Sequence, residues 1–255
     1  MKDILEVKNL TIKYNKVILK DISFSIKENT FVTLSGKSGV GKTSLAKAIL
    51  GYIPYEGEIK VNESKIELVE ENPNNNIIGD LVEEELHIVL KNLKYSKKDQ
   101  NDQIEKIISD LKIESIKSKL TTHLSGGEKQ IVSFIKTILK KPKLLILDNC
   151  FTMVDKIKKE KIMKYLKKYK QEENATIIYI SSELNDLLFG EEIAILNESE
   201  LIIESTNEIL KQESIFKNNK IELPFMADLS NRLKYYGLVE KPIYDLDKMV
   251  NHLWK

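Results

Sequence analysis

A glycine-rich segment near the N-terminus has the composition and spacing of a phosphate-binding loop. Residues 36–43, GKSGVGKT, match the pattern G-x-x-x-x-G-K-[ST]. They lie between a short β-branched run at residues 31–34, which predicts a strand, and a helical pattern from Ser44 to Leu50. The glycines allow backbone N–H groups to face phosphate oxygens, and the helix start adds the positive end of its dipole. Lys42 is expected to reach the β- and γ-phosphates, and Thr43 to ligate Mg²⁺. The segment therefore predicts nucleotide binding by Gly36, Lys37, Ser38, Gly39, Val40, Gly41, Lys42, Thr43 and Ser44.

A second motif, LSGGE, precedes a helical pattern and an apolar strand that ends in Asp148. Its Ser125 is a typical helix N-cap, and the N–H groups at a helix start form another site suited to an anion. Together with the phosphate-binding loop, this motif closely resembles the ATP-binding subunits of ABC transporters, whose signature motif is LSGGQ. The resemblance implies that the signature closes over the γ-phosphate of ATP held by the other subunit of a dimer. The residues concerned are Ser125, Gly126, Gly127 and Glu128.

Other positions of the chain fall into register with the same family. The resemblance implies that Tyr14 stacks on adenine. A core tyrosine is the alternative, but the distance of Tyr14 before the phosphate-binding loop fits the family. It also implies that Asp148 holds Mg²⁺ through water, and that Asp155, which ends the segment TMVD, belongs to the D-loop that crosses to the partner. ATP and Mg²⁺ are therefore the expected ligands. The resemblance covers nearly the whole chain.

Two segments resemble a narrower group, the ATPases of energy-coupling factor (ECF) transporters. Residues 69–86, VEENPNNNIIGDLVEEEL, are similar to the Q-loop region of that group, and residues 223–254 are similar to its small C-terminal domain. The C-terminal segment has the pattern of two amphipathic helices, which would form a helical cap, a dimerisation element or both. One apolar face would carry Met226, Leu229, Leu233 and Tyr236, and the other Leu246, Met249, Val250, Leu253 and Trp254, with Asp245 as a helix cap.

Three positions depart from the family pattern where the hydrolytic chemistry resides. Asn149 occupies the position of the general-base glutamate, Glu71 that of the Q-loop glutamine and Ser182 that of the switch histidine. An asparagine cannot take a proton from water, and loss of a positioned base costs about 10²–10⁴ in rate. Ser182 is short and uncharged, whereas Glu71 could ligate Mg²⁺ but adds negative charge beside the phosphates. The sequence therefore predicts a site that binds ATP but has no intact catalytic set.

The elements that must position these residues alternate between strands and helices. This order, with a phosphate-binding loop, predicts a parallel α/β sheet with the phosphate site at its carboxyl edge. The resemblance implies the ABC-type P-loop NTPase fold, with antiparallel β and helical subdomains and a small helical C-terminal tail. We expect an ATPase domain over residues 1–205, including a helical subdomain at about 81–141, and a C-terminal helical domain over residues 206–255.

Composition and charge narrow the possible function classes. The chain has 255 residues, and its 40 Lys and Arg residues balance 39 Asp and Glu residues, a net charge of +1 that argues against nucleic-acid binding. Its single cysteine, Cys150, excludes an internal disulfide and is expected in the core. No apolar run is long enough to span a bilayer. The chain alone is therefore expected to be cytosolic, and the family resemblance implies that it docks as a peripheral protein at the cytoplasmic face of the cell membrane.

The preferred hypothesis is an ATP-binding subunit of an ECF-type importer for a vitamin or a metal ion, with weak or no hydrolysis at its own site. Its partners would be a paralogous catalytic ATPase in a heterodimer, a transmembrane coupling protein and a separate membrane protein that binds the substrate. Two alternatives stay open. One is an active ABC ATPase in which Glu70, Glu71 or Glu183 replaces the base, and the other is a non-transport ABC protein.

Overall fold

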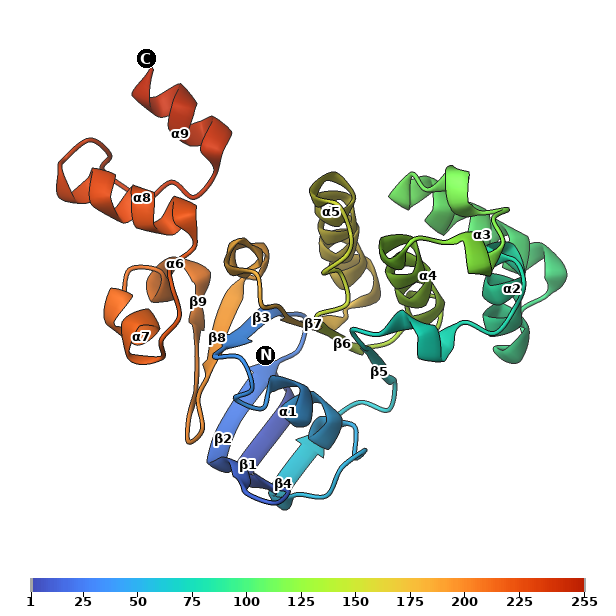
Figure 1. Ribbon diagram of the computed structural model, residues 1–255, viewed down its shortest axis with the longest axis horizontal. Helices are drawn as coiled ribbons and strands as arrows, with labels where there is room; N and C mark the ends of the chain where they lie inside the picture. The colour runs from blue at the N-terminus through green and yellow to red at the C-terminus, as the bar shows by residue number, and fades with distance from the viewer. Residues whose placement is uncertain (1, 255) are drawn as a thin grey trace. The chain divides into compact units, whose positions relative to one another are not determined.

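The computed structural model describes residues 2–254, and for residues 75 and 76 the backbone alone (Figure 1). It comprises two compact units, each assembled from separate stretches of the chain. The first unit consists of Met1–Ile4, Lys27–Asn29 and Val61–Ile178. The second consists of Leu5–Ile26, Thr30–Lys60 and Tyr179–Lys255.

The first unit combines parallel strands with most of the long helices. β5 (Ile66–Val69) and β6 (Leu144–Asp148) pair in parallel, and all five residues of β6 are buried, as in a strand covered on both faces. β7 (Thr176–Ile180) begins in this unit. The helices and short 3₁₀ segments are η1 (Pro73–Asn76), α2 (Val82–Asn92), α3 (Lys97–Leu111), η2 (Glu114–Ile116), η3 (Thr121–His123), α4 (Gly126–Ile138) and α5 (Lys156–Glu173).

The second unit contains strands of two sheets and the C-terminal helices. β1 (Asp3–Lys13) lies between β2 (Val17–Lys27) and β4 (Glu56–Val61) in a three-stranded sheet built mainly from this unit. β3 (Phe31–Gly36) pairs in parallel with β8 (Glu192–Leu196), which pairs in antiparallel with β9 (Leu201–Ser205). The helices are α1 (Lys42–Ile49), η4 (Leu184–Phe189), α6 (Thr206–Ile209), α7 (Glu213–Asn218), α8 (Phe225–Tyr235) and α9 (Leu246–Leu253).

Elements predicted from local patterns are confirmed with small shifts at their ends. The run at residues 31–34 is part of β3, the strand that ends in Asp148 is β6, and the helix expected from Ser44 begins two residues earlier, at Lys42. β9 ends at Ser205. The proposed domain boundary there, and the helical subdomain at about 81–141, stay predictions.

The C-terminal helices pack on a buried cluster within the second unit. Ile193 and Ile195 of β8 are fully buried together with Ile209, Phe216 and Ala227. In α8 the fully buried positions are Ala227 and Ser230, whereas Tyr236, expected on the packed face, is 73% exposed. Small side chains at these positions allow close approach, and the Ser230 hydroxyl accepts a hydrogen bond from the Ile243 amide at 2.7 Å.

The last helix, α9, has the predicted cap and an apolar face that is largely exposed. The Asp245 carboxylate accepts a hydrogen bond from the Lys248 amide at 2.9 Å, as an N-cap does. Met249 is buried, whereas the other apolar residues expected on this face are exposed, namely Leu246, Val250, Leu253 and Trp254. In residues 2–254, no helix is both long enough and apolar enough to cross a membrane.

A buried carboxylate connects the start of α2 to α4 in the first unit. Glu85 is 1% exposed, and its side chain accepts hydrogen bonds from the Ile78 and Gly79 amides and from the Lys136 ammonium. These partners satisfy the charge and the lone pairs of the carboxylate in a low-dielectric site. Removal of one member of such a group leaves the remaining charged or polar groups buried without a partner.

Glu85→Ala is therefore expected to lower the free energy of unfolding by about 3–5 kcal/mol. Glu67→Ala is a matched control, because Glu67 pairs with Lys140 at 2.8 Å while both side chains are partly exposed, and its expected loss is below about 1 kcal/mol. Urea unfolding followed by circular dichroism measures both changes. Equal losses would show that the buried carboxylate is not a structural anchor.

Candidate functional site

The phosphate-binding loop, residues 36–43, connects β3 to α1 in the second unit and leaves several polar residues at the surface. Gly39 and Gly41 have φ values of 77° and 112°, in the region that favours glycine. A Cβ added to Gly41 would lie 2.8 Å from Cγ2 of Ile18, whereas one added to Gly39 would meet nothing within 4 Å. The loop thus combines a conformation that needs glycine with open space above it, which fits a phosphate group.

Lys42 lies folded over this loop. Its Nζ donates to the Gly36 carbonyl at 2.6 Å and to the Lys37 carbonyl at 3.2 Å, and the residue is 9% exposed. α1 starts at Lys42 with no acidic residue in its first turn, so the positive end of its dipole is not offset there. Thr43 is exposed at the same helix start. The charge and geometry of this helix start suit a phosphate anion.

Tyr14 and the segment after β7 also belong to the second unit. Tyr14 is 51% exposed, which rules out the core interpretation and leaves its ring accessible for stacking. Ser182 and Glu183 are exposed as well. The backbone beside them is fixed by buried Asp186, whose Oδ2 accepts hydrogen bonds from the Tyr179 hydroxyl at 2.6 Å and the Ser181 hydroxyl at 2.7 Å. Sequence reasoning missed the positioning role of Asp186.

The first unit holds the carboxylate and the asparagine at the end of β6. Asp148 is 3% exposed, and Asn149 follows with a φ of 47°. Asparagine tolerates this left-handed region better than glutamate does. The asparagine at position 149 therefore suits the local backbone conformation, in addition to lacking a group that could act as a base. Cys150 is fully buried as predicted, and burial, aided by Asp148, raises the pKa of its thiol.

The signature residues form a capped helix start in the first unit. The Ser125 hydroxyl accepts from the Glu128 amide at 3.3 Å, and the Glu128 carboxylate accepts from the Ser125 amide at 2.9 Å, which is a capping box. Burial acts to raise the pKa of Glu128, but Lys119, at 2.7 Å, and the Ser125 amide outweigh it, and the pKa lies below its usual value. The N-cap expected of Ser125 is confirmed.

The signature glycines pack closely against Met153. A Cβ on Gly126 would lie 2.4 Å from the Met153 sulfur, and a Cβ on Gly127 would lie 2.4 Å from the Met153 carbonyl oxygen. The first obstacle is the end of a flexible side chain, and the second is backbone. Asp155, two residues later, caps α5 by accepting from the Lys158 amide at 3.0 Å, which lowers the pKa of Asp155.

The predicted Q-loop position also contacts this region. The Glu71 side chain is exposed, and its backbone carbonyl accepts from the side-chain nitrogen of Gln130 at 3.2 Å. Within the first unit, the Glu71 backbone, the signature helix and the segment before Asp155 are therefore connected. Sequence reasoning missed Gln130, because its partners lie far away along the chain.

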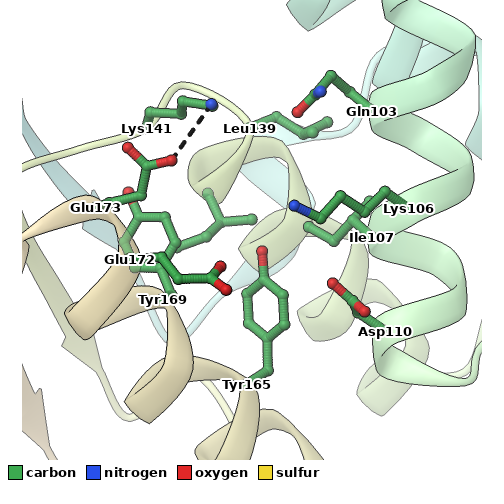
Figure 2. Close-up of a pocket in the computed structure, with 11 residues that line it drawn as sticks. Gln103, Lys106, Ile107, Asp110, Leu139, Lys141, Tyr165, Tyr169, Glu172 and Glu173 are labelled. Atoms are coloured by element: carbon green, nitrogen blue, oxygen red, sulfur yellow. Dashed lines mark ion pairs between the residues drawn. The ribbon is translucent and has the colours of Figure 1, made fainter.

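A small cavity in the first unit is unsuited to a nucleotide. α3, the end of α4 and α5 enclose about 50 Å³ lined by side chains of both charges, including an ion pair between Lys141 and Glu173 at 3.3 Å (Figure 2). Tyr165 and Tyr169 form part of the wall, and the Tyr169 hydroxyl donates to the Pro142 carbonyl at 2.8 Å. Its volume and lining indicate a packing gap between helices.

The side chains predicted to bind Mg²⁺ offer oxygen atoms, which are the ligands that this ion prefers. Among residues 2–254, no three His, Cys, Asp or Glu residues gather into a protein-only metal site. Mg²⁺ in nucleotide sites is commonly held by one or two protein oxygens together with phosphates and water. The exposed Thr43 hydroxyl in the second unit and the Asp148 carboxylate in the first unit are each an oxygen donor of this kind.

Comparison with known proteins identifies the family. The family model described as "ABC transporter" matches residues 19–152, just over half of the chain. The chain belongs to the ABC transporter family. Among similar proteins of this family, the energy-coupling factor transporter ATP-binding protein EcfA of Pediococcus pentosaceus is 27% identical, covering 93% of this chain and 91% of its own length. EcfA1 of Mycoplasma mobile is 28% identical over 98% of this chain and 96% of its own.

Solved structures confirm the predicted ABC fold. CbiO1 from Clostridium perfringens, described as part of the ABC transporter complex cbiONQ, has a TM-score of 0.74 at 23% identity and covers 90% of this chain and 99% of its own. A dimeric ATP-binding cassette bound to ADP and phosphate has a TM-score of 0.70 at 24% identity over 79% of this chain and 98% of its own. The fold is the ABC-type α/β P-loop NTPase fold, with antiparallel and mixed sheets and helices.

The packing against Met153 predicts different responses at the two signature glycines. Gly127→Ala should lower the free energy of unfolding by about 1–3 kcal/mol, because its Cβ meets a backbone carbonyl that cannot swing away. Gly126→Ala should change it by less than about 1 kcal/mol, because the exposed Met153 side chain can rotate. Thermal unfolding measures both, and the reverse order would contradict this packing.

Proposed function

We propose that this protein is the ATP-binding subunit of an ECF-type ABC importer with a degenerate hydrolysis site of its own. An intact phosphate-binding loop in a chain that carries Asn149 in place of the general base is the observation that carries the proposal. The ECF assignment is supported by relatives of that name that align over more than nine-tenths of both chains. Localisation at the cytoplasmic face of the membrane follows from this role.

ATP would bind through the parts of the site that are intact. Lys42 would exchange its present carbonyl partners for phosphate oxygens, the N–H groups of residues 36–44 would surround those oxygens, and Tyr14 would stack on adenine. Thr43 and Asp148 would hold Mg²⁺, with Glu71 as a further candidate. When bound, Mg²⁺ neutralises phosphate charge.

Hydrolysis at this site would be slow because neither Asn149, at the position of the general base, nor Ser182, at the position of the switch histidine, can activate water. The Asn149 amide cannot accept a proton at neutral pH. The Ser182 side chain carries no positive charge and is much shorter than a histidine. A site without its positioned base loses about 10²–10⁴ in rate, so bound ATP would persist and hold a dimer together.

The signature residues would act on ATP bound to a second, catalytically complete ATPase. The start of α4, with Ser125, Gly126 and Gly127, would present N–H groups and the helix dipole to the γ-phosphate of that nucleotide. Such preorganised donors commonly contribute about 3–4 kcal/mol to transition-state stabilisation. Glu128 completes the capping box, and Asp155 would belong to the loop that reaches the partner.

The membrane partners would be a transmembrane coupling protein and a separate membrane protein that captures the substrate, a vitamin or a metal ion. We place the coupling protein near residues 71–90. Ile78 and Ile88 support this position, because their apolar side chains are 85% and 42% exposed in the first unit.

The purified chain alone is expected to bind Mg·ATP and to release phosphate about 10²–10⁴-fold more slowly than a complete site. Asn149→Glu should recover little activity, because Ser182 and Glu71 are unchanged and glutamate fits the left-handed backbone poorly. Nucleotide titration and steady-state phosphate release provide the measurements. Fast turnover that Lys42→Ala abolishes would instead support a substitute base among Glu70, Glu71 and Glu183.

In a reconstituted heterodimer with the catalytic paralogue, the two kinds of site should respond differently to mutation. Gly126→Asp should abolish turnover by placing an anion where the signature receives γ-phosphate, whereas Gly126→Ala, the steric control, should retain most of it. Lys42→Ala weakens only the site of this chain and should reduce turnover less than Gly126→Asp. Equal damage from Lys42→Ala and Gly126→Asp, or transport by a homodimer, would refute the division of roles.

A further inference from the structure

Gln130 is a buried amide that joins three segments of the first unit. It lies in α4 and is 1% exposed. Its side-chain nitrogen donates to the Glu71 carbonyl and to the Thr152 hydroxyl, each at 3.2 Å, and its oxygen accepts from the Met153 amide at 2.9 Å. These partners are 59, 22 and 23 residues away in the sequence.

A carboxamide is the side chain that satisfies all of these partners. Each of its two N–H groups has one acceptor, and its oxygen has one donor. A buried amide or carbonyl that loses such a partner stays out of water without a hydrogen bond, which destabilises the folded state. A carboxylate could still accept a hydrogen bond from the Met153 amide, but it would offer no hydrogen to the Glu71 carbonyl. A thioether could replace neither of these two hydrogen bonds.

Gln130 fixes the residue against which the signature packs. The Met153 amide bonds to Gln130, and the Met153 carbonyl and sulfur lie where Cβ atoms on Gly127 and Gly126 would be. Gln130 also lies about one turn after these glycines, on the same side of α4. Movement of the Met153 backbone would therefore alter the start of the signature helix.

We propose that Gln130 is a positioning residue that ties residues 70–74, the Glu71 segment, to residues 152–155, the Met153 segment, and to the signature. Displacement of the Glu71 segment would then reach the signature through one rigid side chain. The part of this inference that concerns transport rests on the proposed function, in which the Glu71 segment lies beside the coupling protein. Gln130 itself needs no contact with ATP.

Two substitutions divide the hydrogen bonds of Gln130. Gln130→Met keeps a similar volume and removes every bond, whereas Gln130→Glu keeps an acceptor for the Met153 amide and, when ionised, removes the donors. Gln171 is the matched control, because it is an exposed glutamine of α5 in the same unit. Gln171→Met and Gln171→Glu carry the same chemical changes at a site without these partners.

Hydrogen–deuterium exchange on the full chain measures the positioning role without any need for activity. Exchange at the Met153 amide should rise about tenfold in Gln130→Met, as expected for loss of one buried hydrogen bond. It should stay within about threefold of the wild-type rate in Gln130→Glu, where an acceptor is retained. Unchanged exchange in Gln130→Met would overturn the proposal, and the Gln171 variants should match the wild type.

ATP turnover of the heterodimer with and without the membrane proteins measures transmission. Both Gln130 variants should lose most of the increase in kcat caused by the membrane proteins, because their hydrogen bond to the Glu71 carbonyl is lost. KM for ATP should change by less than about twofold, because the nucleotide site is intact in both variants. Stimulation equal to that of the Gln171 variants would overturn transmission through Gln130. If even the wild-type heterodimer fails to associate with membrane proteins, the proposed function fails, and exchange at Met153 alone decides the positioning role.

Discussion

The close approach of the signature helix to the Met153 backbone is the constraint on which the arrangement of the first unit depends. Gly127 has no room for a side chain there, and Gln130 holds Met153 in place from the same helix. The Glu128 carboxylate accepts a hydrogen bond from the Ser125 amide in the capping box, so this side chain stabilises the start of α4. The residues of this motif are therefore explained by packing and capping within the chain, and the exposed helix start stays suited to an anion.

Features that depend on neighbours in the sequence could be predicted, and those that depend on distant contacts could not. The phosphate-binding loop and the caps at Ser125 and Asp245 follow from local spacing and side-chain chemistry. The contacts of Gln130 could not be predicted, because they join segments brought together only by folding. The left-handed backbone at Asn149 and the packing of α8 through Ala227 are also set by tertiary structure. The roles of the individual site residues stay predictions.

The proposed function separates nucleotide binding from hydrolysis in physical terms. Binding depends on a glycine-rich backbone, a helix start and Lys42, all of which are present in the second unit. Hydrolysis also needs a group that accepts a proton, and Asn149 offers none. In the proposed function, a subunit that binds ATP without hydrolysing it would keep a dimer closed while its signature serves another site. Asn149 agrees with this account in two respects: its side chain cannot accept a proton, and asparagine suits the left-handed backbone at this position.

The fate of the nucleotide on this chain during turnover tests the account most directly. The heterodimer would be supplied with a photoreactive ATP analogue labelled on either the α- or the γ-phosphate, irradiated during steady-state turnover, and separated into its subunits. We predict that this chain retains both labels equally, because its ATP stays intact, while the paralogue retains mainly the α-label. Loss of the γ-label from this chain to the same extent as from the paralogue would contradict a degenerate site.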